Sequence, residues 1–88
     1  MNQFLEFAKN ALRDSSVPLT YQEIWEKGVE HGLDKKLKTI GKTPWQTIGA
    51  QLFVEVRDNA NSKFIKVGKR PAKFFLRDNE NLLTEKIF

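Results

Sequence analysis

Apolar side chains recur at the three- and four-residue spacing of an α-helix in three segments of this chain. We expect the first helix over residues 2–14. The second helix is expected to start after Thr20 and to end near Gly32, since glycine favours the left-handed conformation that commonly follows a helix. The third is expected over residues 44–59. Its apolar stripe, which we expect to lie in the core, consists of Trp45, Ile48, Leu52 and Val56.

Two of these helices are preceded by residues that cap helix amino termini. Thr20 lies three residues before Glu23, and this spacing predicts a reciprocal capping box. Thr43 and Gln46 have the same spacing and predict a second box. Pro44 suits the first position of the third helix, because the amide hydrogen that proline lacks would have no partner there. The third helix is therefore expected to have a fixed start.

The residues after the third helix favour a β-hairpin. Residues 64–67 and 74–76 are rich in aromatic and aliphatic side chains, and Gly68-Lys69-Arg70-Pro71 between them predicts a turn. Residues 17–19 are expected to add a short third strand. The order of helix, short strand, two helices and hairpin predicts a mainly α, α+β fold. Specifically, we expect a winged helix-turn-helix, with three helices and a C-terminal β-hairpin wing. A three-helix bundle whose hairpin only covers the core is the alternative.

The composition indicates one small domain without catalytic or metal-binding chemistry. The chain has 88 residues, no cysteine and a single histidine, so disulfides, cysteine-ligated zinc and a thiol nucleophile are excluded. No catalytic constellation or phosphate-binding loop stands out. We therefore expect no catalytic residue, no metal, no cofactor and no small-molecule substrate. No apolar run approaches the roughly 20 residues of a membrane span. The expected location is the cytoplasm, at the nucleoid of a bacterium, or the nucleus of a eukaryote.

The net charge of +4 is distributed unevenly along the chain. Residues 34–42 carry four lysines and one aspartate, and residues 63–77 carry six basic side chains and no acidic one. Because the two blocks flank the third helix, they suggest one positive surface whose partner is a polyanion. The alternative is a solvated lysine-rich face without a ligand.

Candidate contacts with double-stranded DNA lie at the start of the third helix and in the hairpin. Glutamine bonds adenine through two hydrogen bonds, and threonine contacts a thymine methyl group or a phosphate. A lysine before the helix would bind phosphate, and a basic wing would reach the minor groove or the backbone. The alternative makes Gln46 a capping residue only. The candidate residues are Lys42, Thr43, Gln46, Thr47, Gln51, Lys66, Lys69, Arg70 and Lys73.

Three segments of the chain resemble the HARE-HTH family. They are PLTYQEIW at residues 18–25, GKTPW at residues 41–45 and FIKVG at residues 64–68. This winged helix-turn-helix module occurs in Asx-like chromatin proteins, bacterial RNA polymerase delta subunits and restriction endonucleases. The resemblance implies a DNA-associated domain, often fused to a nuclease or chromatin module and suggested to sense modified bases. It does not imply catalysis by this segment.

The resemblance extends from about Phe4 to Arg77, and we accordingly expect a domain at residues 1–77. Residues 78–88 are expected to be a tail, or the start of a linker to another region of a restriction- or nuclease-linked protein. Two other functions stay open. One is a protein–protein interaction domain, since the net-acidic segments at residues 1–33 and 78–88 would suit a basic partner. The other is a regulatory domain that contacts RNA polymerase or RNA.

Overall fold

The computed structural model describes residues 2–38 and 41–79. Their elements are α1 (Gln3–Arg13), α2 (Tyr21–Glu30), the 3-10 helix η1 (Leu33–Lys36), α3 (Pro44–Asp58), β1 (Phe64–Val67), β2 (Lys73–Leu76) and the 3-10 turn η2 (Arg77–Asn79). Within these residues, the helices and the hairpin expected from the sequence are confirmed. Residues 80–88, most of the expected tail, lie outside the described residues.

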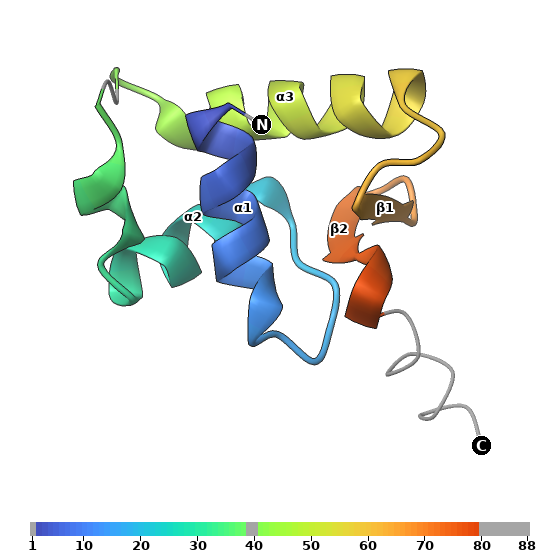
Figure 1. The fold of residues 1–88 in the computed structure, drawn as a ribbon, viewed down its shortest axis with the longest axis horizontal. Helices are drawn as coiled ribbons and strands as arrows, with labels where there is room; N and C mark the ends of the chain where they lie inside the picture. The colour runs from blue at the N-terminus through green and yellow to red at the C-terminus, as the bar shows by residue number, and fades with distance from the viewer. Residues whose placement is uncertain (1, 39–40, 80–88) are drawn as a thin grey trace.

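The helices and the hairpin assemble as a winged helix-turn-helix. α3 lies across one side of the molecule, above α1, α2 and the hairpin in the view of Figure 1. β1 and β2 are antiparallel, with Phe64 opposite Leu76 and Val67 opposite Lys73. On the other side of β2, the amide and carbonyl of Leu19 bond those of Phe74, with N···O distances of 3.0 and 2.7 Å. The expected third strand is therefore reduced to a single-residue bridge.

The amino terminus of α2 is capped as the sequence predicts, whereas the amino terminus of α3 is not. The capping box between Thr20 and Glu23 is confirmed, because each side chain accepts a hydrogen bond from the other residue's amide. The predicted box between Thr43 and Gln46 is wrong, since the Thr43 side chain makes no cap bond. The ψ of Thr43 is 66°, whereas the ψ of Thr20 is 164°, and this rotation turns the Thr43 side chain away from the first helical amides.

The lysine-rich segment that follows α2 begins with a turn that packs against the core. Leu33–Lys36 form one 3-10 turn, and both Leu33 and Leu37 are half-buried against the core. The amide of Lys38 also donates a hydrogen bond to the Gln3 side chain, at 2.9 Å. The apolar contacts of these two leucines fix the course of the chain from the end of α2 to Lys38.

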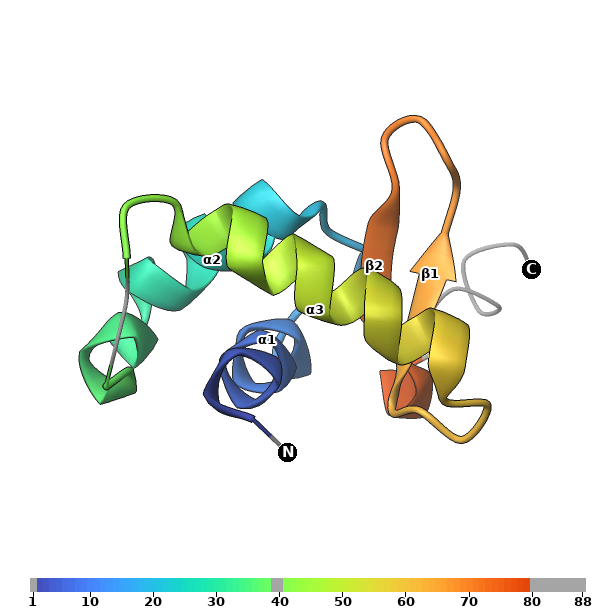
Figure 2. The ribbon, with the colours of Figure 1, turned by 90° about the horizontal axis from the view of Figure 1, so that it is seen from above.

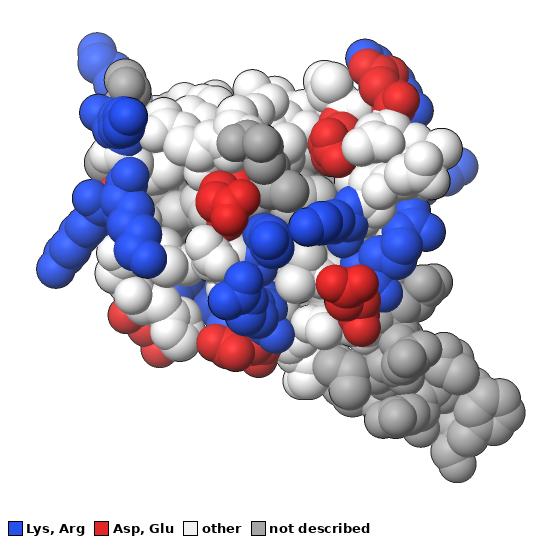
Figure 3. All heavy atoms as spheres, viewed as in Figure 1, with Lys and Arg blue, Asp and Glu red and all other residues white. Residues whose placement is uncertain are grey.

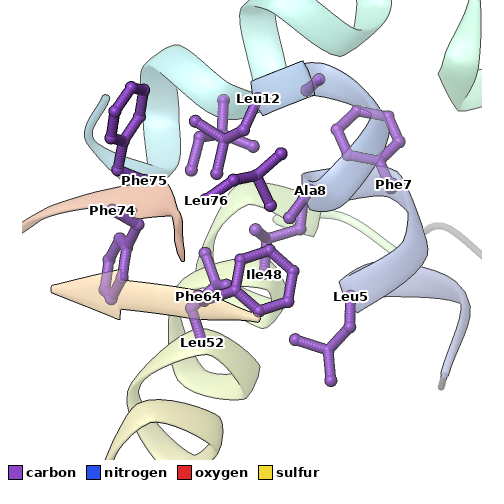
Figure 4. Close-up of a cluster of buried hydrophobic side chains, with 12 residues drawn as sticks. Leu5, Phe7, Ala8, Leu12, Ile48, Leu52, Phe64, Phe74, Phe75 and Leu76 are labelled. Atoms are coloured by element: carbon purple, nitrogen blue, oxygen red, sulfur yellow. The ribbon is translucent and has the colours of Figure 1, made fainter. Parts of the chain in front are cut away.

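The core lies where α1, α3 and the hairpin meet. Figure 4 shows the buried side chains that converge there, among them Leu5, Phe7, Ala8, Leu12, Ile48, Leu52, Phe64, Phe74, Phe75 and Leu76. The prediction that Ile48 and Leu52 belong to the core is confirmed, and Val56 packs against its edge. The same prediction is wrong for Trp45. Its half-buried ring lies outside this cluster and lines a surface groove with Gln22, Trp25 and Glu26 of α2.

Candidate nucleic-acid interface

The outer face of α3 is open to solvent. Figure 2 views α3 from this side, and no other described element covers it. The face opposite carries the buried residues Ile48, Gly49 and Leu52, which fix the orientation of the helix. Within Pro44–Asp58, the exposed side chains are Gln46, Ala50, Phe53, Val54, Arg57 and Asp58. A ligand that approaches α3 would therefore meet these residues first.

The three polar candidates on α3 occupy different positions. Gln46 is exposed on the outer face, but Thr47 and Gln51 are half-buried on one flank of the helix. The Oε1 atom of Gln51 accepts a hydrogen bond from Nδ2 of Asn2, at 2.8 Å. Asn2 in turn caps α1, because its Oδ1 atom accepts from the amide of Leu5. Gln51 thus joins the amino end of α1 to α3, and Gln46 is the candidate whose side chain is free to approach a base.

The amino terminus of α3 combines two sources of positive potential. Its first turn contains no acidic residue, so nothing on that turn offsets the positive end of the helix dipole. Lys42 and Thr43 are exposed immediately before the helix. Lys35 and Lys36 are exposed on η1, and Figure 3 shows lysine and arginine atoms gathered at that end of the molecule. A phosphate group would be stabilised there by both the dipole and the lysines.

The wing supplies a second group of cations. Lys69 and Arg70 are exposed in the loop between β1 and β2, which projects past α3 in Figure 2. Gly68 begins this loop with a φ of 78°, a conformation that glycine adopts without steric cost. Lys66 and Lys73 are exposed on the strands below. The loop therefore holds two cations beyond the body of the domain.

Two of the wing lysines lie beside other described side chains. The ammonium group of Lys66 lies 5.5 Å from the centre of the Phe53 ring, within range of a cation–π interaction. Lys73 lies close enough to Glu23 to contribute to its lowered pKa. The main cause of that pKa shift is the hydrogen bond from the Thr20 amide. Lys73 therefore has a carboxylate nearby, and an approaching phosphate would compete with it.

The two basic blocks of the sequence do not join into one continuous surface. η1 lies beyond the amino end of α3, whereas the hairpin lies beside its carboxyl half (Figures 1 and 2). Arg77 also has a structural partner, because its Nε atom donates to the carbonyl of Ser62 at 2.9 Å. The cations thus form two groups, one at the amino end of α3 and one in the wing beside its carboxyl half.

The middle of that outer face is apolar, and sequence reasoning missed this feature. Ala50, Phe53 and Val54 are exposed there. The signal was present in the sequence, because at helical spacing Val54 lies opposite the stripe that begins at Trp45 and Phe53 lies on its flank. At the end of the helix, Arg57 pairs with Asp58 through two hydrogen bonds of 2.7 and 3.0 Å. This ion pair lowers the pKa of the Asp58 carboxyl and leaves little free negative charge on the face.

The described residues form neither a metal site nor a membrane span. They contain no group of histidine, aspartate or glutamate side chains that could hold a metal ion. Their helices include none with the length and apolarity needed to cross a membrane. His31 follows α2, and its amide donates to the carbonyl of Lys27 at 3.1 Å.

The sequence matches a family model over nearly its whole length. The model is HARE-HTH, a helix-turn-helix domain whose description names ASXL and restriction endonuclease among its members, and the match covers residues 3–77. That range includes α1, α2, α3 and both strands of the hairpin. Neither a curated protein nor a solved structure gives a match to the chain.

Proposed function

The chain belongs to the HARE-HTH family of helix-turn-helix domains, and we propose that it binds double-stranded DNA. The observation that carries this proposal is the arrangement around α3. Its outer face is open, its first turn contains no acidic residue, and exposed cations lie at its amino end and in the wing beside its carboxyl half. An elongated, negatively charged ligand with a groove as wide as a helix fits this arrangement, and the major groove of duplex DNA has that width.

In the proposed complex, α3 enters the major groove with its amino-terminal turns and with its outer face as far as Val54. Lys42 and the positive end of the helix bind one backbone phosphate, and Gln46 faces the base edges. The loop at Lys69 and Arg70 contacts the adjacent backbone or minor groove, where a narrow groove attracts arginine. Lys66 and Lys73 add charge along the wing. These contacts fix the position of the domain through phosphates and leave base reading to α3.

The half-buried candidates have supporting positions in this complex. Thr47 lies on the flank of α3 and would meet the backbone rather than a base. Gln51, held by Asn2, keeps α1 against α3. We therefore assign base reading to the outer face of α3 and treat Gln51 as a residue that positions the helix.

A finer proposal concerns the protein to which such a domain belongs. The family description includes restriction endonucleases. This supports a role in directing a nuclease-linked protein to DNA, with modified bases among the candidate ligands. Such a role would place the protein with the DNA, in the cytoplasm of a bacterium or the nucleus of a eukaryote.

A second candidate function is protein binding, including binding to RNA polymerase. The exposed apolar side chains on α3 favour it, because clustered apolar residues on a surface often mark a protein interface. DNA and protein binding differ in their dependence on salt. Neutralisation of phosphates gives a steep and predictable loss of affinity as salt rises.

The experiment is fluorescence anisotropy with short duplexes across a salt series. Neutralisation of about five phosphates predicts a slope of about −4 to −5 in a plot of log K against log salt. A variant with Lys42→Ala, Lys69→Ala and Arg70→Ala should flatten the slope by about 2 to 3 units. The control removes the same charge from α1 and α2, through Lys9→Ala, Arg13→Ala and Lys27→Ala. Equal effects of the two variants, or no saturable binding of duplex by the wild-type protein, would exclude the proposed interface.

A further inference from the structure

The apolar strip on α3 lies where the proposed complex would place the floor of the major groove. Phe53 is 41% exposed, Val54 is 47% exposed and the neighbouring Ala50 is also exposed. Gln46, Ala50 and Val54 are spaced four residues apart, so they form one row along the outer face of α3. A recognition surface built in this way offers one amide and several methyl groups to a ligand.

The Phe53 side chain is held in place by the wing. Its ring meets the Phe74 ring edge to face, with centroids 5.2 Å apart and planes at 88°. The Lys66 ammonium group lies 5.5 Å from the centre of the Phe53 ring. A fixed aromatic ring loses little conformational freedom when it binds a ligand, so its contact area is available for recognition.

Charges beside the strip suit a nucleic acid. Within Pro44–Asp58, the two acidic side chains are already engaged: Asp58 pairs with Arg57, and Glu55 accepts from Nδ2 of Asn59 at 3.1 Å. Glu55 is also half-buried, away from the outer face. Lys66 stands at the wing side of the strip. An apolar strip with cations beside it and no free carboxylate on its helix complements a groove that has methyl groups at its floor and phosphates along its edges.

We propose that Phe53 and Val54 contact the 5-methyl groups of pyrimidines in the major groove. The methyl group of thymine is the one apolar feature that unmodified DNA presents there, and alanine and phenylalanine are among its usual partners. Gln46, in the same row as Val54, would bond an adenine in the same run of base pairs. The inference rests on the proposed DNA binding and specifies which chemical feature of the bases is read. Because 5-methylcytosine carries the same methyl group as thymine, Phe53 and Val54 would contact either base in the same way.

The test removes the methyl group and leaves base pairing intact. Binding is measured to a short duplex of A·T pairs and to its copy with dU in place of every dT. The wild-type protein should bind the dU copy about fourfold more weakly for each methyl group contacted, since one buried methyl group is worth about 0.8 kcal/mol. A second pair of duplexes, built of G·C pairs with either cytosine or 5-methylcytosine, shows whether the methyl group of 5-methylcytosine also strengthens binding. A methyl effect in either pair supports the contact, and its absence from both overturns it.

Variants of the strip connect the effect to these residues. Val54→Ala and Phe53→Ala should each bring the ratio of the two affinities closer to one. Neither removes a charge, so the salt dependence should stay as in the wild-type protein. If Phe53→Ala fails to fold, Val54→Ala alone tests the contact. The Val54 side chain lies outside the core, so the substitution should leave the fold intact. The matched control is Val17→Ala, which shortens a valine that is 42% exposed in the segment between α1 and α2. An unchanged ratio in both α3 variants contradicts the assignment.

The outcomes separate this inference from the proposed function. If duplex binding is lost in the Lys42, Lys69 and Arg70 variant but dT and dU bind equally, the proposed function stands and the methyl contact is wrong. If the wild-type protein binds no duplex, both are wrong.

Discussion

Gly28 in α2 fills a position that has no room for a side chain. A Cβ atom at this position would lie within 3.0 Å of three carbon atoms of the Phe7 ring of α1. The ring is itself 3% exposed and stacks on Trp25, with centroids 5.2 Å apart and planes at 23°. Because Gly28 faces the outer edge of the ring and Trp25 covers one of its faces, Gly28→Ala must push α1 and α2 apart or displace Trp25.

The expected effect is the difference of two opposing terms. Alanine in a helix interior is favoured over glycine by about 1 kcal/mol. Overpacking of a tight core costs about 1–3 kcal/mol, occasionally more, and the position of the Phe7 ring puts Gly28→Ala at the upper end. We therefore expect a net loss of about 2 kcal/mol in the free energy of unfolding. For a domain of this size that corresponds to a fall of about 8–16 °C in Tm.

Urea and thermal unfolding, followed by circular dichroism, measure this loss. The matched control is Gly49→Ala on α3, where a Cβ atom would lie 3.0 Å from Cγ of the half-buried Tyr21. This approach is less close than that of a Cβ atom at Gly28 to the Phe7 ring, so Gly49→Ala should change stability by less than about 1 kcal/mol. In a double variant, Phe7→Leu should reduce the destabilisation that Gly28→Ala causes, with a coupling energy of about 1 kcal/mol or more. A Gly28→Ala protein as stable as the wild type would refute the proposed tight packing.

The capping box and the start of β1 give the remaining predictions. Thr20→Ala should lower stability by about 1 kcal/mol in urea unfolding, because the amide of Glu23 loses its acceptor. Glu23 has a lowered pKa in the folded protein, so its charged form stabilises the fold at neutral pH and this contribution is lost as the pH falls through the folded pKa. As the pH falls, the free energy of unfolding of the Glu23→Gln variant should therefore decrease less than that of the wild type. An equal decrease in the two proteins would contradict this. Ser62→Ala should cost about 1–3 kcal/mol, since the buried amide of Phe64 donates to the Ser62 hydroxyl at 3.1 Å. Phe64→Ala should cost about 3–5 kcal/mol, and a native-like Tm for that variant would contradict the core in Figure 4.

The parts of the fold that local chemistry determines were predictable from the sequence. Pro44 fixes the start of α3, and the spacing of Ile48 and Leu52 places its buried face correctly. The box between Thr20 and Glu23 depends only on a four-residue segment with an extended first residue, and it forms. The same rule failed for Thr43, because its φ of −131° and ψ of 66° differ from the extended backbone of Thr20.

Features that depend on distant residues were not predictable. The bond from Asn2 to Gln51 joins residues 49 positions apart, and no local pattern indicates it. Trp45 continues the apolar stripe of α3 in sequence, but it lies outside the core, in a surface groove beside α2. The apolar outer strip differs from these features, since the positions of Phe53 and Val54 outside the buried stripe indicate it locally.

The most direct test of DNA binding through α3 and the wing is a titration of the ¹⁵N-labelled protein with a short duplex, followed by NMR. Amide signals from residues 42–54 and 66–73 should shift in a saturable way. Those of residues 14–19, in the segment after α1, should stay in place. Shifts confined to α1 and η1, or no shifts at protein and duplex concentrations well above the Kd from anisotropy, would contradict the proposed interface.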